Sequence, residues 1–222
     1  APDKTELRPV KGKQAFPGLK TGSLDTLVHR FTWTLSRDAG SLNYTRVMNF
    51  DGQGFLVRKD LGIEKISDLD GAVLCVSQGS TSAFQNNEQA LTAYGAKRCD
   101  AMTTDSFGLA AHSQKLADQK QHVILPERIS KEPIGPLVAH GEDRLGDAIR
   151  WTLNALIAAE EFGITQANID EAKKTSKNPE VKRLLGVTGK MGEKLGLEND
   201  WAFRAIKAVG NYGEIWNRNL GP

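Results

Sequence analysis

Short apolar runs alternate with a helical pattern in the middle of the chain. Residues 72–77 and 98–103 are strand-like, and between them the segment from 80 to about 94 has the spacing of a helix. Gly95 stands where that helix would end. Because a strand–helix–strand order favours two parallel neighbouring strands, the pattern predicts a parallel sheet and an α/β fold.

The two ends of the chain have different patterns. Near the N-terminus, residues 6–10 and 26–29 are expected to form short strands. From residue 144 onward the apolar positions recur at helical spacing. The helices and last turn of this part are expected at 144–162, 166–175, 179–185, 200–209 and 212–217.

Two extended segments, near residues 53–58 and 134–138, enclose the middle block. Glycines in the first and prolines in the second are typical of connections that bend. We therefore expect a two-lobe protein with a double hinge at these segments. Lobe 1 is expected to comprise residues 1–55 and 138–222, and lobe 2 residues 56–137.

Composition narrows the classes of partner. The chain has 222 residues, of which 39% are hydrophobic and 25% charged, and its net charge is +2. Such a chain is typical of a globular protein with a substantial core. Lys and Arg form no long basic run, so nucleic acid is not an expected partner. No apolar run approaches the ~18 residues that span a membrane. The four histidines lack the mutual spacing of a metal site, and no cofactor is expected.

Three polar segments, each after a strand-like run, supply groups suited to a free α-amino acid. Thr32 and Thr34 place hydroxyls beside the guanidinium of Arg37, and residues 78–82 add hydroxyls and glycine at a strand-to-helix turn. Arginine pairs bidentately with a carboxylate, and N–H groups at a helix start complete an anion site. Asp105, at the end of the next strand, offers a carboxylate to the ligand ammonium.

On these residues the sequence resembles the periplasmic solute-binding proteins of polar and general L-amino-acid ABC transporters, which have the type II periplasmic binding fold. The resemblance runs from about residue 6 to 222 and is most specific at 32–38, 51–60, 98–100, 103–111, 199–204 and 210–214. It implies hinge closure on a free amino acid for import, with a membrane permease as partner and the periplasm as compartment. It implies a binding protein rather than an enzyme.

The resemblance also assigns roles in lobe 1. Arg37 matches the residue that holds the ligand α-carboxylate, and Thr32 and Thr34 would add backbone and hydroxyl contacts. Trp33 either lines the ligand cleft or packs in the core. Arg30 departs from the family pattern, in which a small or amide residue is usual, and a long cation there would narrow the cleft or replace part of the ligand.

In lobe 2 the resemblance points to a loop and a carboxylate. Gly79, Ser80 and Thr81 match the loop at the start of the first helix, where Thr81 donates to the ligand carboxylate. The alternative is that Ser80 or Thr81 only caps that helix. Asp105 matches the residue that takes the ligand ammonium.

Two family segments have no counterpart, so the chain is expected to be an abbreviated member with an incomplete lobe 1. One is a strand–helix unit that would lie between 6–10 and 26–29, and the other belongs to lobe 2. A vacant sheet position leaves backbone groups unpaired. The two flanking strands could pair directly, another segment of the chain could fill the gap, or a second copy could cover it. Of these we expect self-association, giving a homodimer. The alternative function is a degenerate member that has lost transport and acts as a dimeric interaction or signalling module.

Cys75 and Cys99 lie in the two strand-like runs of the middle block. If these strands are neighbours about 4.8 Å apart, the Cα atoms come within disulfide range. The expected oxidising compartment favours the same pairing. The alternative is a pair of buried thiols.

Overall fold

The computed structural model describes residues 5–10, 12–40, 42–76, 84 and 86–221. The chain forms two compact units, which are described separately. Unit 1 comprises Ala1–Met48 and Gly135–Pro222, and unit 2 is Asn49–Ile134. The chain thus passes between the units after Met48 and after Ile134, a few residues before the lobe boundaries expected from the sequence. A hinge role for these passages stays a prediction.

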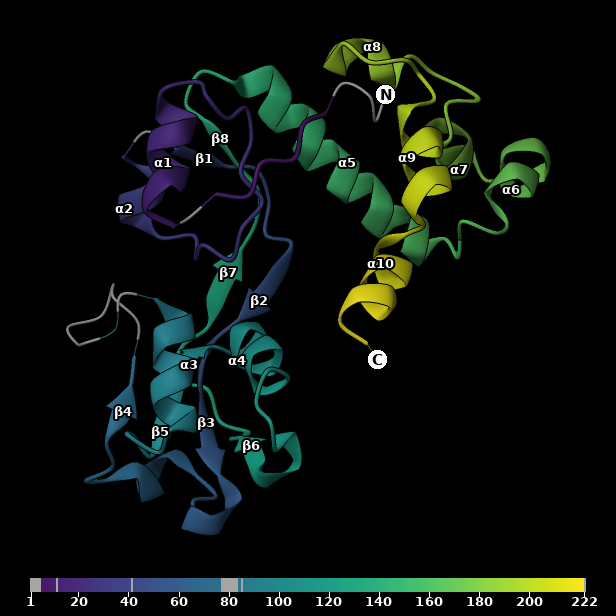
Figure 1. The fold of residues 1–222 in the computed structure, drawn as a ribbon. Helices are drawn as coiled ribbons and strands as arrows, with labels where there is room; N and C mark the ends of the chain where they lie inside the picture. The colour runs from purple at the N-terminus through teal and green to yellow at the C-terminus, as the bar shows by residue number, and fades with distance from the viewer. Residues whose placement is uncertain (1–4, 11, 41, 77–83, 85, 222) are drawn as a thin grey trace. The chain divides into compact units, whose positions relative to one another are not determined.

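Unit 2 contains a four-stranded sheet in the order β4-β5-β3-β6. The strands are β4 (Leu74–Cys75), β5 (Ala101–Asp105), β3 (Gln53–Arg58) and β6 (His122–Ile124). β4 and β5 are parallel, whereas β3 runs antiparallel to both of its neighbours. The predicted strand–helix–strand unit is therefore confirmed, with α3 (Asn87–Gly95) between β4 and β5 (Figure 1).

Side-chain alternation in the central strands of unit 2 builds a core on each face of the sheet. Leu56 and Met102 are fully buried on the face covered by α3 and by α4 (Ser106–Ser113). Val57 and Ala101 are fully buried on the other face. The remaining elements of the unit are β2 (Asn49–Asp51), η2 (Lys59–Leu61), η3 (Ile66–Leu69), η4 (Gln119–Gln121) and β7 (Glu132–Ile134), with β2 and β7 antiparallel.

Helix α3 begins later than the sequence pattern suggested. It starts at Asn87, because the side chain of Asn86 accepts a hydrogen bond of 2.9 Å from the Gln89 N–H and caps the first turn. The expected start at residue 80 lies outside the described residues.

A disulfide joins Cys75 of β4 to Cys99, just before β5. The two Cα atoms are 5.7 Å apart, and both side chains are buried. The predicted pairing is confirmed, and it links the two parallel strands of unit 2 where the sheet meets α3.

Unit 1 is built around a shorter sheet. It holds α1 (Gly12–Lys20), α2 (Leu35–Asp38) and the antiparallel pair of β1 (Leu42–Tyr44) and β8 (Leu137–Ala139). Residues 26–29 contribute an isolated bridge from Leu27 to Leu137 rather than a full strand. The strand expected at residues 6–10 is not formed. Leu7 is 89% exposed, and Pro9 lacks the N–H that a sheet needs.

Helices form the rest of unit 1, close to the ranges expected from the sequence. They are α5 (Asp143–Glu161), α6 (Ile169–Thr175), α7 (Pro179–Leu184), α8 (Met191–Leu195), α9 (Trp201–Val209) and α10 (Tyr212–Asn219) (Figure 1). Leu185, Ile169 and Ile206 are fully buried where α5, α6, α7 and α9 pack together. The sequence pattern did not predict α8, a short helix that ends at Gly196, whose φ is positive. No helix in the described part of the chain is long and apolar enough to cross a membrane.

Candidate functional site

Arg37 lies in α2, the short helix that begins after Thr34. Its Nη1 donates a 2.7 Å hydrogen bond to the Thr32 carbonyl, and the side chain is half-buried. No carboxylate of the described residues lies within ion-pair distance of this guanidinium. Arg37 thus keeps a positive charge that the described part of the fold does not neutralise.

Tyr44 holds the segment before α2 in place from strand β1. Its ring is 1% exposed, and its hydroxyl donates to the Thr32 carbonyl at 2.9 Å. Burial raises the pKa of Tyr44, and the nearby Arg37 charge acts in the opposite direction. Trp33 stacks on the Tyr44 ring at 5.0 Å between centroids and packs against the core of unit 1. Thr34 lies at hydrogen-bond distance from Ser36, 3.2 Å between hydroxyl oxygens.

Asp105 ends β5 and caps α4 in unit 2. One carboxylate oxygen, Oδ1, accepts a 2.6 Å hydrogen bond from the Gly108 N–H. The sequence pattern did not anticipate this capping role, although aspartate at a helix start is common. Asp105 is therefore oriented by the helix that follows it.

Asp51 is a second carboxylate at the start of α4, and our reading of the sequence missed it as a functional candidate. Its two oxygens accept hydrogen bonds of 3.1 Å each from the N–H groups of Ser106 and Phe107. Because helix N-termini stabilise negative charge, the start of α4 holds both carboxylates: backbone N–H groups donate to both oxygens of Asp51 and to Oδ1 of Asp105. The sequence did hold a signal for Asp51, because it precedes Gly52 at the start of segment 51–60, one of the segments most specific to the family.

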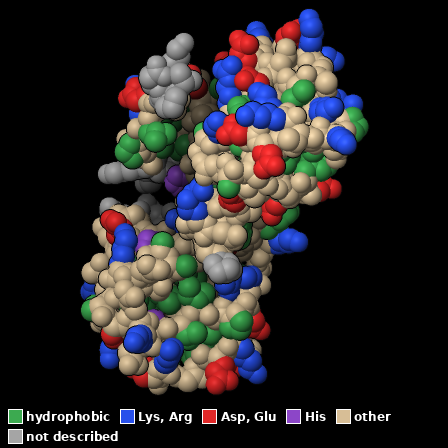
Figure 2. All heavy atoms as spheres, turned by 90° about the vertical axis from the view of Figure 1, so that its right-hand side faces the viewer, with side chains coloured by type: hydrophobic (Ala, Val, Ile, Leu, Met, Phe, Trp, Pro, Cys, Tyr) green, Lys and Arg blue, Asp and Glu red, His purple; other side chains and the backbone are tan. Residues whose placement is uncertain are grey.

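Gly79, Ser80 and Thr81, which the sequence places beside the ligand carboxylate, lie outside the described residues. Among the residues that the structure describes, no group of three or more His, Cys, Asp or Glu side chains could hold a metal ion. Figure 2 shows Lys and Arg side chains interspersed with Asp and Glu over the face in view.

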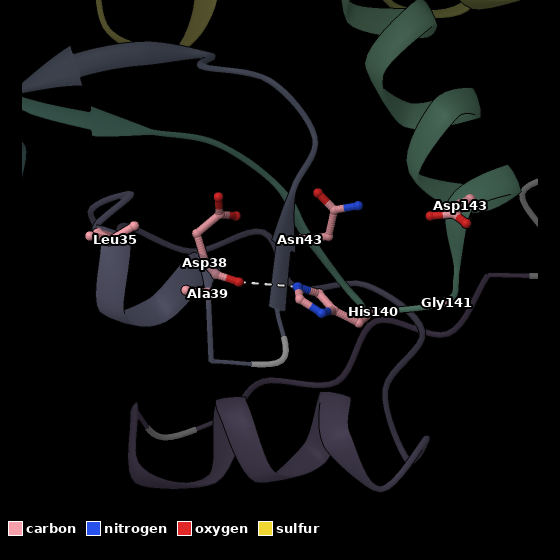
Figure 3. Close-up of a pocket in the computed structure, with 7 residues that line it drawn as sticks. All are labelled: Leu35, Asp38, Ala39, Asn43, His140, Gly141 and Asp143. Atoms are coloured by element: carbon pink, nitrogen blue, oxygen red, sulfur yellow. Dashed lines mark hydrogen bonds between the residues drawn. The ribbon is translucent and has the colours of Figure 1, made fainter.

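A hollow on the surface of unit 1 lies beside α2 and has a volume of about 480 Å³ (Figure 3). Its lining includes Asp38 of α2, Asn43 of β1 and Asp143 of α5, but not Arg37. His140 Nε2 closes one side through hydrogen-bond contacts of 3.0 Å to the Asp38 carbonyl and 2.7 Å to the Leu42 carbonyl. The hollow is thus acidic and separate from the guanidinium.

A line of hydrogen-bonded side chains runs from the buried Tyr94 in the unit 2 core to the exposed Asp118 at the surface. The Tyr94 hydroxyl lies 2.7 Å from His122 Nδ1, and His122 Nε2 lies 3.1 Å from Asp118 Oδ1. With the imidazole proton on Nε2, Tyr94 donates to Nδ1 and Nε2 donates to the carboxylate. Burial raises the pKa of Tyr94, and the Arg58 guanidinium opposes that shift. The hydrogen bond from His122 lowers the pKa of Asp118.

The hydrogen bond from His122 to Asp118 predicts that the Asp118 carboxylate contributes to the stability of the fold in a pH-dependent way. Because the folded-state pKa of Asp118 is lowered, its contribution is present above the unfolded value of about 3.9 and is lost as pH falls through the folded value. We expect Asp118→Asn to lower the thermal midpoint at pH 6, as followed by circular dichroism, and the difference from wild type to shrink as pH falls below the unfolded pKa of about 3.9. Asp70→Asn is the control, because Asp70 is exposed and no described residue donates a hydrogen bond to its carboxylate. A difference from wild type that does not shrink at all as pH falls from 6 to 2 would contradict this assignment.

No family model matches the sequence, but individual proteins do. The glutamate/glutamine/aspartate/asparagine-binding protein BztA of Rhodobacter capsulatus is 44% identical over 99% of this chain and 71% of its own length. The general L-amino acid-binding periplasmic protein AapJ of Rhizobium johnstonii is 45% identical over 99% of this chain and 70% of its own. The chain belongs to the family of amino-acid-binding periplasmic proteins of ABC transporters. The putative amino-acid ABC transporter-binding protein YhdW of Escherichia coli is 37% identical over 98% of this chain and 70% of its own length.

Solved structures agree with this family. A periplasmic binding protein of an ABC transporter from Brucella ovis, with glutathione bound, is 43% identical, with a TM-score of 0.93 over 100% of this chain and 76% of that chain. An ancestral arginine-binding protein bound to glutamine shares the fold, with a TM-score of 0.59 over 72% of this chain and 75% of that one at 24% identity.

These comparisons confirm the predicted family and its two-lobe α/β fold, and they confirm that this chain is shorter than its relatives. The relatives are solute-binding proteins, not enzymes.

Proposed function

We propose that this protein binds a free α-amino acid in the periplasm and delivers it to the membrane permease of an ABC transporter. The observation that carries the proposal is the half-buried Arg37 guanidinium, which no described carboxylate neutralises. A charge kept in this state costs free energy unless an anion pairs with it. A ligand carboxylate supplies that anion, and the planar fork of arginine matches it bidentately.

Each other candidate residue has a role in this proposal. Asp105 receives the ligand ammonium with the carboxylate that α4 orients. Thr32 and Thr34 supply backbone and hydroxyl contacts beside Arg37, and Trp33 stacked on Tyr44 stiffens the segment that carries them. The loop residues proposed to donate to the ligand carboxylate are Gly79, Ser80 and Thr81. Closure at the two passages between the units, which selects the ligand-bound state, is part of the proposal.

The ligands named for related proteins share one chemical feature. BztA is named for glutamate, glutamine, aspartate and asparagine, AapJ for L-amino acids in general, and the Brucella ovis protein was solved with glutathione. Glutathione retains a free α-amino and α-carboxylate group on its γ-glutamyl residue, so all of these compounds present an α-amino-acid head group. This supports recognition of the head group rather than of one side chain, and glutathione is the second candidate ligand.

Isothermal titration calorimetry of the whole chain tests the proposal. The titrants are the twenty L-amino acids, glutathione and L-glutaminamide, in which the α-carboxylate is replaced by a neutral amide. We expect saturable heat from at least one free amino acid, and much weaker binding of L-glutaminamide than of L-glutamine. Absence of binding across the panel would reject transport of amino acids. Tight binding of glutathione alone would reassign the ligand to γ-glutamyl peptides.

Self-association stays a prediction, and neither the fold nor the related proteins support it. Its premise was a vacant position between two strands of unit 1, and residues 6–10 form no strand to flank one. Light scattering at micromolar concentration measures it directly. The degenerate signalling module likewise has no observation in its favour, and the same calorimetry separates it from a transport protein.

A further inference from the structure

The Arg37 guanidinium lies over two phenylalanine rings. Its Cζ is 5.7 Å from the centroid of Phe16 and 5.6 Å from that of Phe31. Both distances fall within the range in which a cation is attracted to an aromatic face. Phe16 comes from α1 and Phe31 from the segment before α2, so separate parts of unit 1 meet at this side chain.

The two rings are themselves fixed by the fold. Their centroids are 4.5 Å apart, and both rings are partly buried against the core of unit 1. His29 stacks on Phe31 at 4.2 Å with an angle of 19° between the planes. The guanidinium is therefore placed against a supported aromatic surface rather than against mobile side chains.

An aromatic surface suits a group that must remain available to a ligand. Arginine loses substantial rotamer freedom when it is immobilised, so a preorganised side chain binds its partner with a smaller entropic cost. The Thr32 carbonyl anchors the guanidinium at Nη1, and the phenyl faces hold it without competing as anions. A carboxylate in their place would neutralise the charge.

We propose that Phe16 and Phe31 are positioning residues that hold the Arg37 guanidinium ready for the ligand carboxylate, an inference that rests on the proposed function. Phe16 is the more informative of the two, because α1 is distant in sequence from the segment that carries Arg37. This pair of rings, here called the Phe16–Phe31 clamp, contributes to affinity for the charged carboxylate and not to the choice of ligand side chain.

The test compares Phe16→Leu, which keeps an apolar side chain without a π face, with Phe16→Tyr, which keeps the ring. With L-glutamine as titrant, Phe16→Leu is expected to weaken binding about 3- to 30-fold relative to wild type. Phe16→Tyr is expected to retain most of the wild-type affinity. Phe203→Leu is the matched control, because Phe203 carries cation contacts from Lys173 and Lys207 in a different core cluster of unit 1. Circular dichroism establishes that each variant is folded.

Equal affinities for wild type and Phe16→Leu would overturn the clamp, as would an equal loss in Phe16→Leu and Phe16→Tyr. A folded wild type that binds no titrant rejects the proposed function instead, and a ligand-free measurement then decides the clamp. The NMR signal of the Arg37 Nε–H is identified by its absence in Arg37→Lys. In wild type, ring currents should shift this signal, and the side chain should show restricted motion. In Phe16→Leu it should move toward the values of exposed arginines. An Arg37 signal that is the same in both proteins contradicts the inference.

Discussion

Arg37→Ala is expected to weaken amino-acid binding by about 2–5 kcal/mol, which is roughly 30-fold to several-thousand-fold in affinity. The physical reason is the loss of a charge-assisted, bidentate contact to the ligand carboxylate in a half-buried setting. Calorimetry with L-glutamine, or with whichever amino acid of the panel binds wild type, measures the change. Arg37→Lys keeps the charge but loses the planar fork, so an intermediate loss is expected.

Two controls make this result specific to the carboxylate. Arg204→Ala removes an exposed arginine from α9 of the same unit, which has no role in the proposed site, and should leave affinity within a few-fold of wild type. For L-glutaminamide, which lacks the ligand anion, wild type and Arg37→Ala should differ little. Unchanged heats with L-glutamine in Arg37→Ala would show that another group binds the carboxylate.

Loss of the Cys75–Cys99 disulfide is expected to destabilise unit 2 by about 3–4 kcal/mol. The bridge closes a loop with a sequence separation of 24. In the chain-entropy model such a cross-link removes conformational entropy from the unfolded chain and so raises its free energy by that amount. The variant is Cys75→Ser with Cys99→Ser, measured by denaturant unfolding with and without reductant. Because the chain has no cysteine outside this pair, reductant should lower wild-type stability and leave the double variant unchanged.

The two units can be monitored separately in that experiment. Tryptophan fluorescence reports unit 1, because all four tryptophans, at positions 33, 151, 201 and 216, belong to it. Hydrogen exchange of peptides from residues 49–134 reports unit 2. We expect faster exchange there in the double variant. Equal exchange with and without the bridge would mean that the disulfide contributes nothing to the stability of unit 2.

The sequence predicted most of the fold because its signals were local or had a family precedent. The parallel pair on either side of α3 and the C-terminal helices follow from periodicity, and the disulfide follows from strand context. The prediction of a strand at residues 6–10 was wrong, because no neighbouring strand pairs with this segment. Without such a neighbour its apolar residue Leu7 remains 89% exposed. Strand formation depends on neighbours that a local pattern does not reveal.

The candidate site was only partly accessible from the sequence. Arg37 and Asp105 could be named from motifs, but their supporting contacts come from residues remote in the chain. Tyr44 reaches back to the Thr32 carbonyl, and Phe16 meets Arg37 from another helix. Asp51 joins Asp105 at α4 across the β3–β5 pairing. Tertiary proximity of this kind has no local sequence signal.

The order of the units along the chain has a consequence for the order in which they fold. Unit 2 is one continuous segment whose first and last residues, Asn49 and Ile134, are paired across β2 and β7. Unit 1 is interrupted by it, and β1 pairs with β8, which is translated only after all of unit 2. Domains generally fold as units as they emerge, so unit 2 can fold first. During that interval the apolar residues of α1 and β1 lack their partner strand, so the core of unit 1 closes only after β8 has arrived.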